Sequence, residues 1–420
     1  MTLPSSDSGQ PEASMTKDEQ SLSTASVLLP ESEAGTPVVP QSGSLPGNVA
    51  AHLKPQRRQD FRLIGMMLAV KAVCMVFAVQ SFHVWADQPT KGWRAWLEVW
   101  NRWDAVNYLK LAEFGYQATG EMRPLMVFYP LYPWLISLFT YVTRDSLVSA
   151  FLISTIASLI VGLLLFRLIA LDYSAEIAEQ TVWFLFIFPT SYFLHIGYTE
   201  SLFLALALGC LLAARREDWL SAGCLGALAC MARGPGILLM PTLAVEALSQ
   251  YRATRRWNWQ WLWILIVASG FGVYLWINAR EAGNPFAFMQ IRRESYYISM
   301  SWPWVGIRQT IGALGHNPAA AEMSGRQELI FIALGFVGMI VSWIKLRPIY
   351  SVWITLNWLI VTCVSFIASV PRYTLVMFPL HLLFALAATK NRIWGIFVTV
   401  WSLLFLALFI SAFARGFWAY

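Results

Sequence analysis

The chain has 420 residues, of which 57% are hydrophobic and only 13% carry a charge. Its mean hydropathy is +0.53, whereas soluble domains carry roughly 25% charged residues, so the composition excludes an ordinary soluble protein and indicates an integral membrane protein. The net charge of +6 does not indicate nucleic-acid binding, because the basic residues stand at the ends of apolar stretches rather than in a soluble basic patch.

The first 50 residues are rich in Ser, Pro, Thr and Glu and show no apolar periodicity. This composition is typical of disorder, and no basic segment followed by an apolar core is present, so a signal peptide is not expected. We therefore predict a disordered cytoplasmic tail over 1–55 and one polytopic membrane domain over 56–420. The basic residues that place the tail inside are Lys54, Arg57, Arg58 and Arg62.

Apolar stretches recur to the end of the chain, and together they predict an all-α bundle of about 11 transmembrane helices. The stretches are 61–81, 129–143, 146–170, 177–194, 198–214, 218–232, 234–250, 259–278, 327–345, 349–369, 372–389 and 393–414. Six of them lie between an outer loop and an inner basic cluster, where an odd number must cross. We therefore expect a half-helix or re-entrant segment, placed at 188–200, where Pro189, Gly197 and Glu200 interrupt the apolar run.

Lys/Arg bias places basic clusters near 252–256, 345–347 and 390–392 inside, and the long loops 82–128 and 279–326 outside. Several arginines break this bias by lying on the outer side. A phosphate group is a natural partner for them, because the guanidinium fork matches it; snorkelling toward lipid headgroups is the alternative. These arginines are Arg280, Arg292, Arg293, Arg308, Arg326 and Arg372.

Residues 100–133 contain a lone carboxylate, Asp104, among tryptophans and tyrosines. If 98–114 forms one helix in the first outer loop, Asp104, Asn107, Tyr108 and Leu111 share a face. A carboxylate there can act as a general base toward an alcohol, and the aromatic rings suit a sugar. The alternative is an interfacial aromatic belt with one solvated acid.

Three further positions combine charge with an interrupted apolar run. Glu200 either orients an arginine or an acceptor, or simply caps a helix start; the neighbouring His195 is more simply a core residue. Arg233, in MARGPGILL, requires a partner inside the membrane. Arg372 and Tyr373 follow Pro371 on the outer side, where anchoring of a helix end is the alternative role.

The sequence shows no nucleotide-binding loop and no hydrolase or metalloprotease motif. Its five cysteines all lie in apolar runs without a CxxC pair or a Cys/His cluster, so neither a disulfide framework nor a metal site is expected. A sugar donor presented from the membrane therefore fits better than a soluble nucleotide sugar, and no cofactor is predicted.

Six segments together resemble a known family. They are RWDAVNYLKLAEFGY (102–116), FYPLYP (128–133), FPTSYFLHIGYTESLF (188–203), ARGPGIL (232–238), GNPFAF (283–288) and PRYTLVMFPL (371–380). On these the chain resembles the GPI mannosyltransferase II (PIG-V-like) family of polytopic glycosyltransferases, as a prokaryotic-type member. The resemblance implies a GT-C fold with a long first extracytoplasmic loop, a polyprenyl- or dolichyl-phosphate-mannose donor, and inverting transfer with Asp104 as catalytic base.

The resulting prediction is a multi-pass cell-membrane glycosyltransferase whose active site faces the extracytoplasmic side. Its partners would be a polyprenyl-phosphate sugar, membrane lipids and a lipid, glycan or protein acceptor. Asp104 is the predicted catalytic residue. The predicted substrate-binding residues are Trp103, Asn107, Tyr108, Tyr129, Glu200, Arg292, Arg293, Arg372 and Tyr373. The alternatives are a transporter or flippase of a lipid-linked sugar, and a non-catalytic scaffold.

Overall fold

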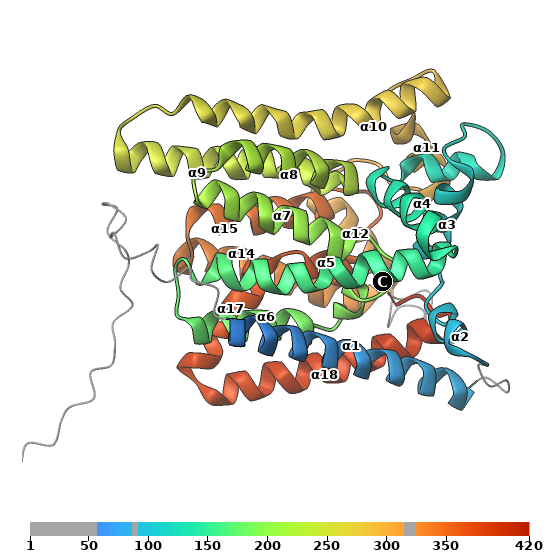
Figure 1. Ribbon diagram of the computed structural model, residues 1–420, viewed down its shortest axis with the longest axis horizontal. Helices are drawn as coiled ribbons and strands as arrows, with labels where there is room; N and C mark the ends of the chain where they lie inside the picture. Colours follow the sequence, from blue (N-terminus) through green and yellow to red (C-terminus); the bar gives the residue numbers. More distant parts are fainter. Residues whose placement is uncertain (1–56, 86–90, 315–324, 420) are drawn as a thin grey trace, which may run out of the picture. The chain divides into compact units, whose positions relative to one another are not determined.

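The computed structural model describes residues 57–85, 91–314 and 325–419. Secondary structure in these residues is helical, apart from one isolated antiparallel bridge between Met300 and Val364. This confirms the predicted all-α class. The predicted tail over 1–55 lies outside the described residues. The first described helix begins at Arg57, two residues after the predicted boundary (Figure 1).

Five helices in the described part of the chain are long and apolar enough to cross a membrane. They are α1 (Arg57–Trp85), α5 (Ser146–Ile169), η5 with α10 (Trp259–Ala282), α14 (Gln327–Lys345) and α18 (Arg392–Ala414). A sixth span results if η2 (Gly120–Val127) and α4 (Leu131–Thr143), which meet at 116°, are counted as one. The predicted number of about eleven spans therefore stays a prediction.

The remaining apolar stretches form helices too short for that length criterion. They are α6 (Ala175–Phe186), α7 (Glu200–Arg215), α8 (Trp219–Ala232), α9 (Leu239–Thr254), α15 (Pro348–Thr362) and α17 (Phe378–Lys390). Each begins or ends near a predicted boundary. The apolar runs therefore located the helices, although not their full lengths.

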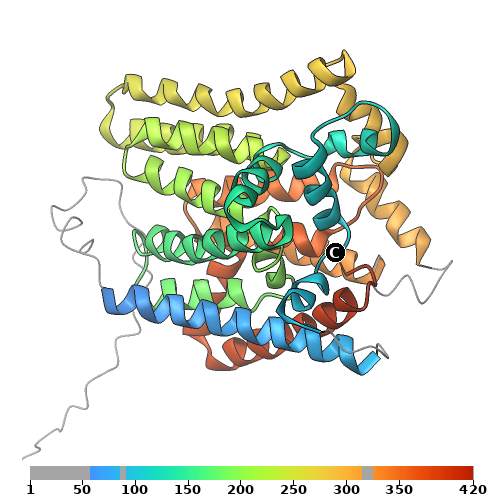
Figure 2. The ribbon, with the colours of Figure 1, turned by 45° about the vertical axis from the view of Figure 1, so that its right-hand side comes forward.

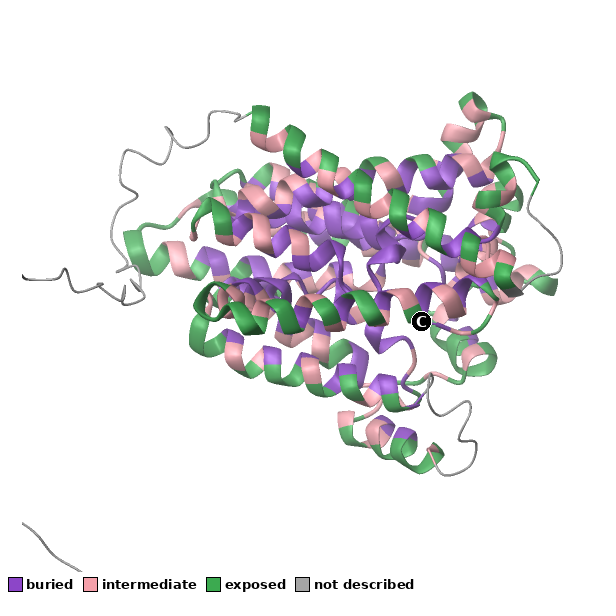
Figure 3. Cartoon of the chain, turned by 90° about the horizontal axis from the view of Figure 1, so that it is seen from below, coloured by how far each residue is buried: buried purple, intermediate pink, exposed green. Residues whose placement is uncertain are grey.

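The helix α7 lies at the centre of the packing. It contacts α5 on one side and α8 on another, while α1 packs along α18 (Figures 1 and 2). Most residues of α7 are buried, and buried residues concentrate in the interior helices whereas the outer ones show exposed faces (Figure 3). The N-terminal end of α7, where Glu200 is buried, is therefore held by packing against its neighbours.

The predicted single helix over 98–114 is wrong. The chain instead forms α2 (Trp93–Glu98) and α3 (Asp104–Phe114), separated by a break in which Trp103 has φ 54°. Tertiary hydrogen bonds explain the break: the Arg102 guanidinium donates to the carbonyl of Ala414, and the Tyr198 hydroxyl donates to the Arg102 carbonyl. These partners come from distant parts of the chain, so a local helical period cannot reveal them.

The predicted interruption at 188–200 is present. Helix α6 ends at Phe186, α7 begins at Glu200, and only the short η3 (Ser191–Leu194) lies between them. The segment is fully buried. Within this segment, the backbone carbonyl of His195 accepts a hydrogen bond from Lys71 Nζ at 3.0 Å. Irregular backbone at membrane depth requires such internal partners.

Ion pairs identify the basic end of the bundle. There Arg167 on α5 contacts Asp60 on α1, and Arg215 at the end of α7 contacts Asp172. A second set of charged residues lies near the other end of α7. It joins the start of α7 to the first turn of α3 and to α16 (Val370–Leu375). That second set contains Asp104 and Glu200.

Candidate active site

Four charged side chains, each from a different element, form one continuous chain of ion pairs. Asp104 Oδ2 lies 2.6 Å from Arg372 Nη1. Arg372 Nε also donates to Glu200 Oε1, and that same oxygen accepts a hydrogen bond from Arg233 Nη1. We call Asp104, Glu200, Arg233 and Arg372 the charged cluster. The fold thus pairs residues that the sequence could only suggest one at a time.

Each member of the charged cluster stands at the end of a helix or in a short one. Asp104 and Glu200 are the first residues of α3 and α7, where a carboxylate is stabilised by the helix dipole. Arg233 is the C-cap of α8, with extended backbone. The chain then turns sharply into η4 (Gly234–Leu238): a Cβ on Gly236 would lie 2.4 Å from the Cys230 nitrogen, so only glycine fits.

The short helix α16 that carries Arg372 is held at its start by Glu328. This carboxylate accepts hydrogen bonds from the backbone nitrogens of Ser369 and Val370, each at 2.7 Å. Glu328 is 1% exposed and belongs to the first turn of α14. The two carboxyl oxygens of Glu328 each accept a backbone N–H at the start of α16, where such groups have no partner within the helix. Glu328 therefore sets where α16 begins and hence where Arg372 lies.

Aromatic rings line the charged cluster. The Arg372 guanidinium lies over the rings of Phe193 and Tyr198, at 4.9 and 4.6 Å from their centroids. The Arg233 guanidinium lies 5.1 Å from the Tyr373 ring centroid. Such contacts stabilise cations in a desolvated setting. The rings therefore hold both guanidinium groups in place independently of their carboxylate partners.

Burial differs sharply along the cluster. The Glu200 side chain is fully buried and that of Arg372 is 7% exposed, whereas Asp104 is 27% exposed. Asp104 Oδ2 binds Arg372, while Oδ1 makes no hydrogen bond to any residue that the structure describes. Two acids and two arginines balance in charge, as buried ions require. Asp104 is thus the member that presents a free oxygen to a molecule arriving from outside.

The helix α11 (Ala287–Tyr296) approaches this site from the loop after α10. Burial and the Asp104 carboxylate raise the pKa of Tyr296 to about 12. Arg292, one turn earlier, lies within electrostatic range of the Tyr129 hydroxyl. The Tyr129 hydroxyl also packs against Gly234, the residue after Arg233: a Cβ added at Gly234 would lie 2.9 Å from the hydroxyl oxygen. Arg292 is exposed and makes no ion pair within 57–85, 91–314 and 325–419.

The other predicted substrate-binding residues fall around this arrangement. Tyr108 is buried, and its hydroxyl lies 3.3 Å from Thr199 Oγ1, beside Glu200. The Tyr373 ring packs against the Arg233 guanidinium. Trp103 is 43% exposed and packs edge-on against Trp418, with ring centroids 5.0 Å apart.

Two predicted substrate-binding residues, Asn107 and Arg293, and the core candidate His195 make no hydrogen bond or ion pair with the charged cluster in the described part of the chain. Asn107 is half-buried and Arg293 is exposed, and neither side chain forms a hydrogen bond or ion pair with any residue that the structure describes. His195 is buried against Phe186, and its two ring nitrogens have no hydrogen-bond partner among the described residues. His195 is therefore placed as a core residue.

Sequence reasoning missed three residues. Glu328 was detectable as a lone acid at the start of an apolar stretch, where a buried charge requires a partner. Tyr198 and Trp418 carried no signal, because aromatic residues are common throughout this chain. Their importance follows only from the tertiary contacts with Arg372 and Trp103.

No three His, Cys, Asp or Glu side chains converge in a metal-binding arrangement within the described residues. The expectation that the chain uses neither a metal nor a cofactor stays a prediction.

Comparison with known proteins gives one family match. The family model described as dolichyl-phosphate-mannose-protein mannosyltransferase matches residues 123–277. This range contains Tyr129, Glu200 and Arg233 but neither Asp104 nor Arg372. No match is found among curated proteins.

The chain is also similar to solved structures of an oligosaccharyltransferase from Archaeoglobus fulgidus. Its complex with Zn and sulfate is 12% identical, with a TM-score of 0.41, covering 82% of this chain and 53% of that one. The archaeal oligosaccharyltransferase AglB from the same organism, in complex with an inhibitory peptide and a dolichol-phosphate, is 12% identical with a TM-score of 0.43, covering 84% and 55%. The chain thus spans about half the length of these structures.

Proposed function

We propose that this chain is a membrane glycosyltransferase that moves a sugar from a lipid-phosphate donor to an acceptor hydroxyl. The observation that carries the proposal is the charged cluster, in which Asp104 is tied to Arg372 through one oxygen while its other oxygen stays open. The family match over 123–277, which includes Glu200 and Arg233, supports the same class of reaction.

In the proposed reaction, Asp104 Oδ1 accepts the proton of the acceptor hydroxyl. The acceptor oxygen forms a bond to the anomeric carbon, and the bond from that carbon to the phosphate oxygen breaks, with inversion. The lipid phosphate leaves with the electron pair. Because phosphate is already a competent leaving group, a second carboxylic acid of the kind glycosidases use is unnecessary.

The arginines have separate roles in this proposal. Arg372 is bound to both Asp104 and Glu200, so it orients the base and is not free to neutralise a phosphate alone. Arg292 is exposed and without an ion pair among the described residues, close to Tyr129 and the Arg233 side of the cluster. We assign the phosphate to Arg292, whose guanidinium would stabilise the charge that develops on the leaving group.

The narrower assignments rest on the resemblance to the GPI mannosyltransferase II family. We propose mannose as the sugar and a polyprenyl or dolichyl phosphate as its carrier. We also propose that the charged cluster faces the extracytoplasmic side, because basic residues mark the opposite end of the bundle as cytoplasmic. The acceptor class stays open between lipid, glycan and protein.

The test compares Asp104→Asn with wild-type protein in proteoliposomes supplied with dolichyl-phosphate mannose. We expect Asp104→Asn to lower the turnover of mannosyl transfer by about 10²- to 10⁴-fold, as loss of a general base does. The matched control is Glu113→Gln, which removes an exposed carboxylate from the same helix. Glu113→Gln should unfold at the wild-type temperature. Asp104→Asn should unfold at a lower one, because Arg372 is left buried with less compensation, so turnover is compared per folded protein.

Near-normal turnover in Asp104→Asn would remove the catalytic base from the proposal. A flippase is the competing class, since broken helices and buried charges also occur in transporters. Movement of the labelled lipid across the bilayer by wild-type protein, without sugar transfer to any acceptor fraction, would favour that class instead.

A further inference from the structure

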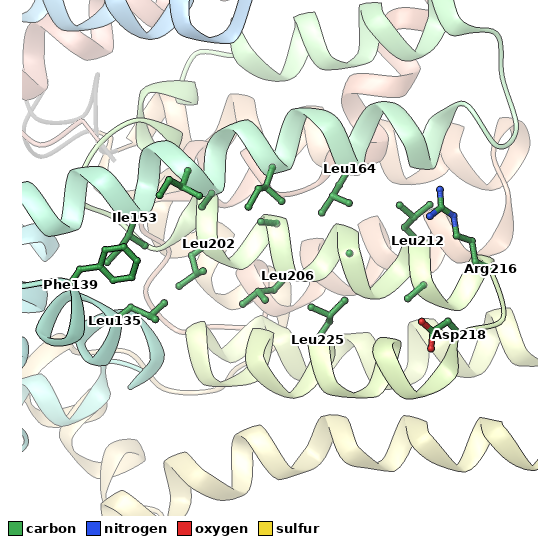
Figure 4. Close-up of a pocket in the computed structure, with 16 residues that line it drawn as sticks. Leu135, Phe139, Ile153, Leu164, Leu202, Leu206, Leu212, Arg216, Asp218 and Leu225 are labelled. Carbon is green, nitrogen blue, oxygen red and sulfur yellow. The ribbon is translucent and has the colours of Figure 1, made fainter. Parts of the chain in front are cut away.

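A long apolar groove runs along α7 on the face turned away from the charged cluster. Helices α4, α5, α7 and α8 form its walls, and its volume is about 510 Å³ (Figure 4). Side chains such as Ile153, Leu202, Leu206 and Leu225 line it. This volume lies within the range of small-molecule pockets, and the lining offers hydrogen bonds only at one end.

The groove is distinct from the candidate active site. Glu200 and Leu202 are two positions apart on α7, which places their side chains about 200° apart around the helix. The rings of Tyr108 and Tyr132, with centroids 5.2 Å apart, pack beside Ile153 at the end of the groove nearest the active site. The Tyr132 hydroxyl is bound to the Ala150 carbonyl, so this layer is fixed.

The polar end of the groove carries two opposite charges. Arg216 and Asp218 lie there, at the turn between α7 and α8, and both are exposed (Figure 4). Arg216 forms no ion pair with any described residue, and Asp218 uses one oxygen to cap α8 through the Ser221 nitrogen at 3.2 Å. Arg215, the preceding residue, belongs to the basic end of the bundle, so this pair lies at a membrane surface.

We propose that the groove binds one acyl chain of a phosphatidylethanolamine-type phospholipid. The phosphate would pair with Arg216 and the ammonium group with Asp218, so that the zwitterionic headgroup matches both charges at once. The acyl chain would lie along α7 between Leu212 and Leu202. A phospholipid fits better than a partner helix, because Arg216 and Asp218, at the membrane surface, are the only charged side chains among the described residues that line the groove.

Gly209 gives the groove its depth at mid-length. A Cβ there would lie 3.2 Å from Leu225 Cδ1 and 3.6 Å from Leu164 Cδ1, both ends of flexible side chains. A larger residue at 209 can therefore be accommodated by small shifts, while its side chain fills the space that the acyl chain would occupy. This makes Gly209→Leu a suitable plug.

The test measures lipids retained by the full chain, reconstituted in phosphatidylcholine nanodiscs that also contain either phosphatidylethanolamine or phosphatidylglycerol. Native mass spectrometry of the protein released from the discs counts the bound lipids. We expect wild-type protein to retain one phosphatidylethanolamine in preference to phosphatidylglycerol. Arg216→Gln should lower that retention about tenfold, the effect of losing one charge-assisted hydrogen bond, and Gly209→Leu should abolish it.

The matched control is Arg252→Gln, which removes an exposed arginine in the last turn of α9, away from the groove. It should retain the lipid as wild-type protein does. Equal retention in wild-type and Arg216→Gln proteins would show nonspecific lipid and overturn the proposal. A dimer that dissociates on Gly209→Leu would overturn it as well, by showing that a second copy of the chain fills the groove.

Discussion

Arg372 donates a hydrogen bond to Asp104 at 2.6 Å, although the two residues are 268 positions apart in the chain. The candidate base comes from the loop after the first membrane helix, and its partner from a short helix near the C-terminus. The geometry of Asp104 therefore depends on the placement of α16, and changes at either end of this pair should affect the same step.

Replacing Arg372 by lysine should lower turnover by about 10²- to 10³-fold, the effect of losing one preorganised donor. Arginine binds Asp104 through Nη1 and Glu200 through Nε at the same time, and a lysine ammonium lacks the planar fork that makes both contacts. Initial rates of sugar transfer at saturating lipid-linked donor would measure the change.

Arg280→Lys is the matched control, because Arg280 is an exposed arginine whose only ion-pair partner in the described structure is the adjacent Glu281. Its turnover should equal that of wild-type protein. If Arg372→Lys retained wild-type turnover, the ion pair with Asp104 would have no part in catalysis.

Replacing Glu328 by glutamine should lower turnover about tenfold, a smaller effect than that of Arg372→Lys. The glutamine side chain keeps one acceptor, but its amide group faces a backbone N–H that the carboxylate oxygen had accepted. One hydrogen bond to a buried backbone N–H is lost, which corresponds to about tenfold. Glu328 is here a positioning residue, acting through Arg372.

A double-mutant cycle separates this role from a general loss of stability. If Glu328 acts by placing Arg372, the double variant Glu328→Gln/Arg372→Lys should be no slower than Arg372→Lys alone, since coupled residues are not additive. Fully additive losses would show that Glu328 acts elsewhere in the protein.

Substitutions of the two exposed arginines of α11, Arg292 and Arg293, should have different effects on the KM for the donor. Arg292 lies within electrostatic range of Tyr129, whereas Arg293 shows no contact with the cluster. Arg292→Gln should raise the KM for the lipid-phosphate donor about tenfold, as loss of a charged contact to phosphate would. Arg293→Gln should leave it unchanged. Equal effects of both would indicate general attraction to the membrane surface.

Helix positions were largely predictable because apolar runs and polar breaks act locally. The break at 188–200 was found from Pro189, Gly197 and Glu200, residues that interrupt an apolar period. The break at 99–103 was not found, since it depends on hydrogen bonds from Arg102 and Tyr198 to distant backbone. The lengths of the helices could not be predicted either, because helices such as α6 and α15 end within continuous apolar sequence.

The members of the charged cluster were predictable one by one, since each is a charge in an apolar setting. Their pairing was not. Arg372 was expected to meet a phosphate, yet the fold surrounds it with Asp104 and Glu200. Glu200 and Arg233 are 33 positions apart, a separation that no helical period connects. Only the packing of α7 against α8 brings them together.

At the opposite end of the bundle, Asp172 joins α5 to α7 and α15 through a buried network. Its carboxylate accepts hydrogen bonds from Arg215 at 2.7 and 2.8 Å, from Arg347 at 2.9 Å and from the Tyr350 hydroxyl at 2.8 Å. The Asp172 side chain is 6% exposed. Asp172→Asn should lower the free energy of unfolding by about 3 kcal/mol, because Arg215 is left buried with less compensation.

The same carboxyl predicts how stability depends on pH. Burial raises the pKa of Asp172, but the hydrogen bond and charge of Arg215 outweigh burial and hold the pKa below its ordinary value. A lowered pKa in the folded state contributes stability that is present above the unfolded pKa of about 3.9 and is lost as pH falls through the folded value. Thermal unfolding in detergent should therefore show a constant difference in unfolding temperature between wild-type and Asp172→Asn proteins from pH 8 to about pH 5, and this difference should close at lower pH.

Asp60→Asn is the control, because Asp60 belongs to the half-exposed pair with Arg167. It should change the free energy of unfolding by less than about 1 kcal/mol. A gap that persisted unchanged at acidic pH would mean that Asp172→Asn acts through packing and not through its charge.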